Sequence, residues 1–230
     1  GRGMDETLLD AIRAVQETPG VMRIRLGSLE PKVVTEEFAR ELSGFDKLCP
    51  QFHLSLQSGS DGVLKRMHRR YTADEYRQAA DTLRAYFENP AITTDVIAGF
   101  PGETDEEHAE TEAFLRKIGF ARIHVFPYSR RSGTVADRLP GQVPEEVKKN
   151  RANKLIEIGN QLEIAYVQSL KGAEKEVLFE TASPDGGAEG YTREYVRVRA
   201  DARPGEIRRV RIGETQGTLA VGTILSEERR

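Results

Sequence analysis

The sequence has a single cysteine, no long apolar run and no excess of either charge. That cysteine, Cys49, excludes an internal disulfide framework and any zinc or iron–sulfur site built from several thiolates of this chain. No stretch approaches the length of about eighteen apolar residues that crosses a membrane, and residues 1–5 contain no apolar signal region. We therefore expect no membrane contact and a reducing, cytoplasmic location.

The charges nearly cancel over the whole chain. There are 34 lysines and arginines and 37 aspartates and glutamates, which gives a formal net charge of −3 over 230 residues. This balance excludes a bulk polycation, so any binding of nucleic acid requires a local basic patch. The length allows one large domain or two small ones.

The first two thirds of the chain alternate strand-like with helix-like segments. Short apolar stretches predict strands at 21–26, 52–57, 92–98 and 122–126. Capping boxes at Thr72–Glu75 and Thr104–Glu107 mark the starts of two of the intervening helices. This alternation indicates βαβ units, hence an α/β fold with a parallel sheet. Four strands are too few to close a barrel, so we expect a partial parallel (β/α) barrel.

The last third of the chain has a different hydrophobic pattern. A long helix is expected at 144–170, after a loop rich in Arg, Ser, Gly and Pro. The apolar period then changes to two, which predicts strands at 175–180, 191–200, 207–212 and 218–225. These strands are typical of a small antiparallel β-barrel, of OB-like type, or of a small sandwich of about sixty residues. We therefore expect two domains, 1–170 and 171–230.

The expected ends of the four parallel strands are polar or rich in glycine. Ligands bind at the carboxyl ends of strands in parallel barrels and open α/β sheets. Those ends are Leu26–Glu30, Leu56–Ser60, Val96–Glu103 and Phe126–Ser129. Each turn taken alone is consistent with an ordinary helix cap. The four together favour a ligand site, in which glycine allows close approach of the backbone.

The histidines indicate no metal site, because no two of them have the spacing of metal ligands. His53 alternates onto the same face as Ser55 and Gln57, so it lines a cavity if that face points into a barrel and is otherwise a core residue. The other three are expected to be structural or solvated: His124 in a strand, His68 and His108 at exposed helix positions.

A basic segment, Lys65–Arg70, follows the second strand end. It is either a solvated helix terminus, where cations suit the helix dipole, or a contact for phosphate or carboxylate. Arg130 and Arg131 are expected near the same rim.

The last third also has a face of alternating basic residues. In its second and third strands valine and isoleucine alternate with arginine and tyrosine, so one face is buried and the other is cationic. A cationic face with an aromatic side chain suits an RNA backbone and unstacked bases. The alternative is a solvated face, because the charges of this segment balance. The candidate RNA-binding residues are Arg193, Tyr195, Arg197, Arg199, Arg209 and Arg211.

Five motifs occur in the order of a known family. They are Arg23–Pro31, His53–Ser60, Arg66–Thr72, Thr93–Thr104 and Phe126–Thr134. Through them the sequence resembles the radical S-adenosylmethionine (SAM) methylthiotransferases, iron–sulfur enzymes that put a methylthio group on a substrate carbon. The last third is similar to the TRAM domain, the small RNA-binding barrel of that family.

The residues of two motifs are most similar to those of one subfamily. Leu54–Gln57 and Arg69–Tyr71 resemble the enzymes that modify threonylcarbamoyladenosine (t6A) beside the tRNA anticodon. They are less similar to the subfamilies that act on isopentenyladenosine in tRNA or on a ribosomal protein. The resemblance implies SAM and 4Fe-4S clusters as cofactors, and tRNA as the partner.

The sequence also departs from the family pattern. The CxxxCxxC motif that binds the SAM-cleaving cluster is absent, as is the domain for a second cluster, and Cys49 lies outside both. The resemblance then implies four of six radical SAM barrel strands followed by a TRAM domain. In the family a reduced cluster splits SAM to a radical, which takes hydrogen from the adenine carbon before sulfur and methyl are installed. We expect this chain to form part of the SAM-binding cavity and to bind tRNA, and to be inactive alone.

No catalytic residue follows from the resemblance, but a set facing SAM does. It consists of Ser55, Gln57, Gly99, Gly102 and Glu103, with Arg66 or Arg70 at the SAM carboxylate. The competing interpretations are a non-catalytic RNA-binding protein and an unrelated α/β barrel enzyme. The strand expected at 21–26 has an unpaired edge, which predicts self-association of the chain.

Overall fold

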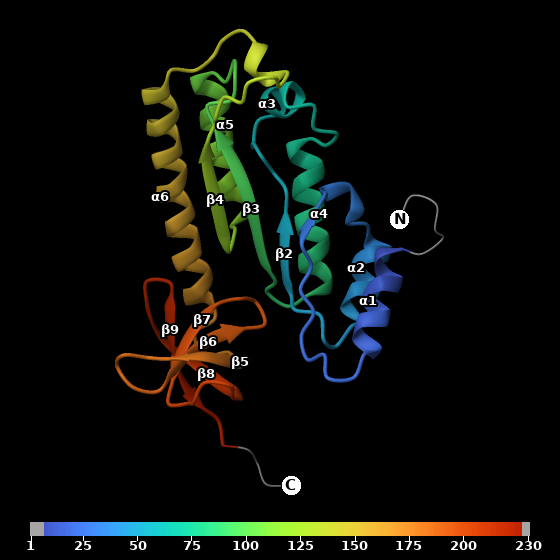
Figure 1. Ribbon diagram of the computed structural model, residues 1–230, viewed down its shortest axis with the longest axis vertical. Coiled ribbons are helices and arrows are strands. Elements are labelled where there is room, and N and C mark those ends of the chain that lie inside the picture. The colour runs from blue at the N-terminus through green and yellow to red at the C-terminus, as the bar shows by residue number, and fades with distance from the viewer. Residues whose placement is uncertain (1–6, 227–230) are drawn as a thin grey trace. The chain divides into compact units, whose positions relative to one another are not determined.

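The computed structural model describes residues 7–226 and divides into two compact units (Figure 1). The units are Gly1–Asn160 and Gln161–Arg230, and each is described by itself. The division falls within the long helix α6 (Glu145–Ser169), ten residues before the boundary expected from the sequence. The division falls there because Val167, near the end of α6, and Leu170, just after it, are buried in the core of the second unit.

The first unit contains a four-stranded parallel sheet, as the alternating pattern predicts. Its strands are β1 (Ser28–Leu29), β2 (Gln51–Leu54), β3 (Ala91–Ala98) and β4 (Arg122–Pro127). They are hydrogen-bonded in the order β1-β2-β3-β4, and all three pairings are parallel. The sheet order therefore follows the chain order, as in successive βαβ units.

Helices precede, connect and follow these strands. They are α1 (Leu8–Glu17), α2 (Glu36–Ser43), α3 (Asp61–Arg66), α4 (Ala73–Tyr86) and α5 (Asp105–Ile118), with 3-10 turns η1 (Pro31–Val33) and η2 (Ala136–Arg138). Both expected capping boxes form: the side chains of Thr72 and Thr104 each accept a backbone N–H, and their own N–H groups donate to the carboxylates of Glu75 and Glu107. Local sequence thus determines where α4 and α5 begin.

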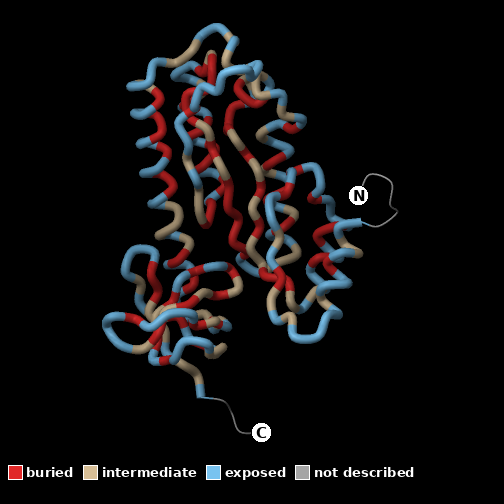
Figure 2. Tube along the Cα trace, in the orientation of Figure 1, coloured by how far each residue is buried: buried red, intermediate tan, exposed pale blue. Residues whose placement is uncertain are grey.

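One face of the sheet forms the core of the first unit. Phe52 and Leu54 of β2 are fully buried, whereas the neighbours between them are half-buried. Their face packs on α4, whose Tyr76 donates a hydrogen bond to the Leu54 carbonyl at 3.1 Å and stacks edgewise near Phe114. Figure 2 shows the buried residues along the strands and the inner sides of the helices. The opposite face of the sheet is less covered.

The strand expected at 21–26 is wrong. Within it only Ile24 pairs, in an isolated bridge to Leu48, and the edge strand β1 begins later, at Ser28. Ile24 is also the only buried residue of the stretch, so a longer ladder would bury no further apolar side chain. Self-association through an edge stays a prediction; the edge strands of the sheet are β1, of two residues, and β4, of six.

The second unit is a closed five-stranded barrel. Its strands are β5 (Glu174–Ala182), β6 (Ala188–Thr192), β7 (Arg197–Ala200), β8 (Ile207–Gln216) and β9 (Leu219–Ile224), in the order β5-β6-β7-β9-β8. The expected small barrel is confirmed; its pairings are antiparallel except that of β7 with β9, which is parallel. The barrel closes tightly: a Cβ atom on Gly190 would lie 1.9 Å from the Leu178 carbonyl oxygen.

The single strand expected at 191–200 is two strands joined by a turn. Thr192 donates its N–H to the carbonyl of Val196 at 2.9 Å, and Tyr195 has a left-handed φ of 69°. A barrel this small needs such a corner, which the alternating sequence does not reveal. Burial still alternates through the turn, so Tyr195 and Arg197 are exposed as expected.

Candidate functional site

The less covered face of the sheet, here called the open face, carries polar side chains from three strands. His53 contacts Thr93 Oγ1 through Nδ1 at 3.1 Å and Asp95 Oδ2 through Nε2 at 3.5 Å. On the neighbouring strand β4, His124 lies opposite Asp95 in the strand register. His53 therefore belongs to a row of polar side chains on this face, in which it contacts Thr93 and Asp95.

Toward the carboxyl ends of the strands the open face becomes apolar. Phe126, which is 51% exposed, pairs in register with the half-buried Ile97. Gln57 extends the pairing beyond β2, because its N–H donates to the Asp95 carbonyl and its own carbonyl accepts from Ile97. Gln57 has a positive φ of 69°, and it and Ser55 are both half-buried. Ser55 and Gln57 thus lie at the carboxyl end of β2, the edge of the sheet at which the sequence predicts a ligand site.

The glycines after β3 serve the turn itself. Gly99 and Gly102 have φ values of 74° and 78°. The space where Gly99 lacks a side chain is filled by Lys148 of α6, whose Cγ would lie 2.5 Å from an added Cβ. The free side of Gly102 faces the Arg66 side chain, whose Nε would lie 3.4 Å from an added Cβ, while the Gly102 N–H donates to the Gly141 carbonyl at 2.8 Å. Both free sides therefore meet other segments of this chain.

Glu103 is held inside the protein. Its carboxylate accepts the Gly99 N–H at 2.9 Å and Arg151 Nη1 at 2.9 Å, and the Glu103 side chain is 2% exposed. Arg151 also donates to the exposed Asp105 at 2.7 Å. Burial raises the pKa of the Glu103 carboxyl. The Gly99 N–H and the Arg151 guanidinium lower this pKa, but their effect is smaller than that of burial. These contacts make Glu103 a brace between the turn and α6.

A cavity of about 310 Å³ opens beside this turn. Its walls are mostly apolar, and two arginines, Arg66 and Arg69, lie at it. Arg66 forms an ion pair with Glu107, and Arg69 Nη1 lies 3.3 Å from Glu30 Oε1. The apolar lining residues are Met67, Ile97, Phe100, Val135, Ala136 and Leu139. A small-molecule site typically has such walls with a few polar groups, and about 300 Å³ is the lower end of its size range.

Arg70 lies at a different cavity, of about 710 Å³, together with Lys65 and Arg69. The two candidate partners for the SAM carboxylate therefore lie at different cavities: Arg66 lines the apolar cavity of about 310 Å³, and Arg70 lines the cavity of about 710 Å³.

The expectation that His108 is solvated is wrong. His108 is buried between α5 and α6, with Nε2 3.2 Å from Glu112 Oε1. Lys154 of α6 reaches the same carboxylate oxygen at 2.7 Å. Burial lowers the pKa of His108, although the nearby Glu112 raises it. Helical periodicity does not reveal this burial, because the helix that covers His108 comes some forty residues later. His68 is exposed, as expected.

In the barrel, four of the candidate arginines already have acidic partners. Arg209 and Arg211 both reach Glu174, at 2.7 Å each, and Arg199 forms an ion pair with Asp185. Arg197 Nε lies 3.6 Å from a carboxylate oxygen of Glu189 in the neighbouring strand. These partners lie on other strands and turns, so alternation along one strand could not identify them.

Tyr195 forms an aromatic platform on this barrel. Its ring stacks on that of Tyr191 with centroids 4.5 Å apart and planes 13° apart, and Tyr195 is 46% exposed. The left-handed turn holds it in this position. Tyr191 is not among the candidate residues expected from the sequence, although alternation places it on the same face as Tyr195.

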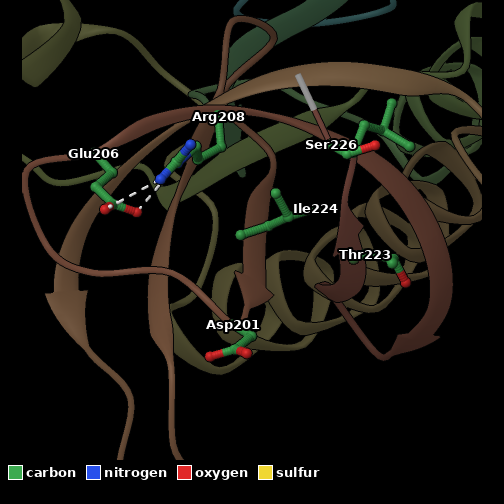
Figure 3. Close-up of a pocket in the computed structure, with 8 residues that line it drawn as sticks. Asp201, Glu206, Arg208, Thr223, Ile224 and Ser226 are labelled. Carbon is green, nitrogen blue, oxygen red and sulfur yellow. Dashed lines mark hydrogen bonds and ion pairs between the residues drawn. The ribbon is translucent and has the colours of Figure 1, made fainter. Parts of the chain in front are cut away.

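A further hollow of about 630 Å³ lies elsewhere on the barrel (Figure 3). Glu206 and Arg208 pair with each other there, and Asp201, Thr223 and Ile224 lie around them. With two acidic side chains against one arginine, this hollow is less suited to phosphate than the candidate arginine face.

Residues 7–226 contain no cluster of three or more His, Cys, Asp or Glu side chains that could hold a metal ion. Cys49 is buried. An iron–sulfur cluster is held by several thiolates, so one cysteine does not fit it. In the same described part no helix is long and apolar enough to cross a bilayer.

Residues 4–115 match the model of the Radical SAM superfamily. The chain is 38% identical over 213 residues to the threonylcarbamoyladenosine tRNA methylthiotransferase MtaB of Thermotoga maritima, which covers 92% of this chain and 49% of that protein. It is 37% identical over 185 residues to the tRNA-2-methylthio-N(6)-dimethylallyladenosine synthase of Thermoanaerobacter sp.. This match covers 80% of this chain and 39% of that protein. Among solved structures, the radical SAM enzyme coproporphyrinogen III oxidase (HemN) of Escherichia coli aligns with a TM-score of 0.52 at 14% identity, over 82% of this chain and 46% of that one.

The solved structure supports the fold alone, whereas the sequence matches define the class of protein. The parallel sheet with its open face is part of a radical SAM fold. The chain belongs to the radical SAM tRNA methylthiotransferase family, which confirms the resemblance carried by its motifs. It spans about half the length of the curated relatives it matches.

Proposed function

We propose that this chain works as part of a tRNA methylthiotransferase that modifies threonylcarbamoyladenosine, with the sheet unit holding SAM and the barrel binding tRNA. The observation that carries the proposal is the 38% identity to a t6A enzyme across 92% of the chain, barrel included. The superfamily uses SAM and a 4Fe-4S cluster, which together supply the radical chemistry when bound. The single cysteine of this sequence does not fit the cluster.

The apolar cavity beside β3 suits the adenosyl part of SAM. Ile97 and Phe100 offer flat apolar walls for a purine, and Arg66 offers a guanidinium for a carboxylate. Ser55 and Gln57 lie at the adjacent strand end and supply hydrogen-bonding groups. Gly99, Gly102 and Glu103 act here through the shape of the turn, since their contacts are to α6, to Gly141 and, at Gly102, to the Arg66 side chain.

The open face favours t6A over dimethylallyladenosine as the substrate. The t6A side chain carries a hydroxyl, a carbamoyl group and a carboxylate, whereas the dimethylallyl group is a hydrocarbon. His53, Asp95 and His124 make the middle of the face polar, and a polar surface that must lose water favours a ligand able to replace its hydrogen bonds.

The barrel suits single-stranded RNA. Tyr195, supported from below by Tyr191, offers an exposed ring on which a base can stack. Around it Arg197 and Arg199 can exchange their carboxylate partners for phosphates, which are anions of similar geometry.

Two measurements test the proposal on this chain. Saturation-transfer NMR should show contact between the protein and the adenine protons of SAM. Ile97→Glu should remove that signal by placing a charge in the apolar cavity, while Ile156→Glu, on an exposed site of α6, should leave it intact. An unchanged signal in Ile97→Glu refutes the assignment of the cavity to SAM.

The substrate is tested with two anticodon stem-loop RNAs that differ only at the modified adenosine. We expect tighter binding of the stem-loop with threonylcarbamoyladenosine than of the one with dimethylallyladenosine. The reverse preference would refute the t6A assignment and support the dimethylallyl subfamily.

A further inference from the structure

The larger cavity next to the proposed SAM cavity has no role in the function described so far. It measures about 710 Å³, and it shares His68 and Arg69 with the apolar cavity. Its walls carry both signs of charge: basic Lys65, Arg69 and Arg70, with His68, and acidic Asp61 and Glu75. The balance among these groups decides what the cavity can bind.

The two carboxylates are already used by the backbone. Asp61 Oδ1 accepts the N–H of Ala73 at 2.7 Å, and Glu75 Oε2 accepts the N–H of Thr72 at 2.8 Å. Both therefore cap the start of α4, where their charge also compensates the helix dipole. They are held away from the basic side chains of the same cavity, with which neither forms an ion pair.

Two of the cations are unpaired. Among residues 7–226, Lys65 and Arg70 form no ion pair or side-chain hydrogen bond, and both are exposed. Arg69 differs, because its guanidinium lies 3.3 Å from Glu30. The arginines of the barrel differ as well, since four of them have carboxylate partners. Lys65 and Arg70 thus have free capacity for an external anion.

The cavity is fixed at the functional edge of the sheet. Tyr71, which follows Arg70 directly, donates its hydroxyl to the carbonyls of Ser55 at 2.6 Å and Leu56 at 3.1 Å. Burial raises the pKa of Tyr71 to about 12, so the hydroxyl stays a donor at physiological pH. The anchor ties the basic segment to the carboxyl end of β2, next to the apolar cavity.

We propose that Lys65 and Arg70 bind backbone phosphates of the single-stranded RNA that carries the target nucleoside, at the mouth of the SAM cavity. The inference rests on the proposed function, because a nucleoside brought to that cavity carries phosphates on both sides. With a net charge of −3 the chain as a whole does not attract RNA, so a local pair of free cations decides where the strand lies.

The test is a salt series on RNA binding by the whole chain. The probe is a fluorescently labelled anticodon stem-loop RNA, followed by anisotropy from about 0.05 M to about 0.4 M salt. The test protein is the double variant Lys65→Gln/Arg70→Gln. The matched control is Lys117→Gln/Lys149→Gln, which removes the same charge from exposed positions on α5 and α6.

The expected effect follows from counterion release. Each phosphate contact to single-stranded RNA contributes about 0.7 to the slope of log affinity against log salt, so the test variant should lose about 1.4. Because this contribution vanishes near 1 M, the loss of affinity should be about 60-fold at 0.05 M and about 10-fold at 0.2 M. Lys65→Arg/Arg70→Lys keeps both charges and should restore the slope.

The outcomes separate this inference from the proposed function. If the test variant binds with the affinity and slope of the control, the phosphate site is refuted while RNA binding by the barrel stands. If the wild-type chain binds no RNA at low salt, both fail. Photo-crosslinks from thiouridine next to the modified adenosine should fall in peptide 61–72, and crosslinks confined to the barrel would overturn the placement.

Discussion

Replacing Arg151 with alanine should destabilise the sheet unit strongly, because it leaves a buried carboxylate without its cation. Arg151 donates to the Glu103 carboxylate at 2.9 Å and to its carbonyl at 3.0 Å, and the Glu103 side chain is 2% exposed. Among residues 7–226, the Gly99 N–H is then the only hydrogen-bond donor left to that carboxylate, with His108 Nδ1 4.0 Å from it. The bond to Asp105 matters little, since Asp105 is 90% exposed.

The magnitude follows from breaking a buried pair by removing one partner, which costs about 3–5 kcal/mol. In a unit of this size that lowers the midpoint of thermal unfolding by about 6–20 °C. Far-UV circular dichroism during urea or thermal unfolding measures the change. The control is Arg13→Ala, whose partner Asp10 is solvent-exposed, and it should cost less than about 0.5 kcal/mol.

The pH dependence gives the prediction a second readout. Burial already raises the pKa of Glu103 in the folded state, and loss of Arg151 raises it further. A carboxyl with a raised folded pKa loses stability as the pH rises through that pKa, so the penalty of Arg151→Ala should be larger at about pH 7.5 than at about pH 5. Adding Glu103→Gln should recover part of the loss. A cost below about 1 kcal/mol, the same at both pH values, would refute the reasoning.

Four further predictions concern the cofactor and the barrel. Anaerobic reconstitution of this chain should give no stoichiometric 4Fe-4S absorption band, because several thiolates are needed and one is present. Gly190→Ala should prevent a native barrel, measured by near-UV circular dichroism, since its Cβ would lie 1.9 Å from the Leu178 carbonyl oxygen; a native spectrum would contradict this. Arg197→Ala with Arg199→Ala should weaken tRNA binding and flatten its salt dependence with little loss of stability, and wild-type affinity at every salt concentration would contradict the RNA face. Tyr195→Ala should lose about 1–3 kcal/mol of binding with an unchanged slope.

Features set by neighbouring residues could be predicted from the sequence. The capping boxes at Thr72 and Thr104 involve residues three apart, and both form as expected. The parallel sheet and the order of its strands follow from alternating helix and strand patterns, which is again local information. The family motifs extended this to the class of enzyme.

Features set by distant segments could not be predicted. His108 is buried because α6 covers it, and a helical pattern on α5 alone cannot show that. The strand at 21–26 failed because pairing depends on what lies beside it, and only Ile24 has a partner. At the candidate site, the positions of Ser55 and Gln57 were predictable from strand alternation, whereas the filling of the Gly99 turn by Lys148 was not.

The carboxylate partners of the barrel arginines have a consequence for selectivity. Glu174, Asp185 and Glu189 are tethered competitors, so any polyanion that docks on this face must first displace an anion that cannot diffuse away. Polymers that offer only charge, such as heparin, gain little from that exchange. RNA gains more, because a base can also stack on Tyr195. If the barrel binds RNA as proposed, these carboxylates protect it from indiscriminate adsorption, and contact with Tyr195 lets it discriminate among ligands of equal charge.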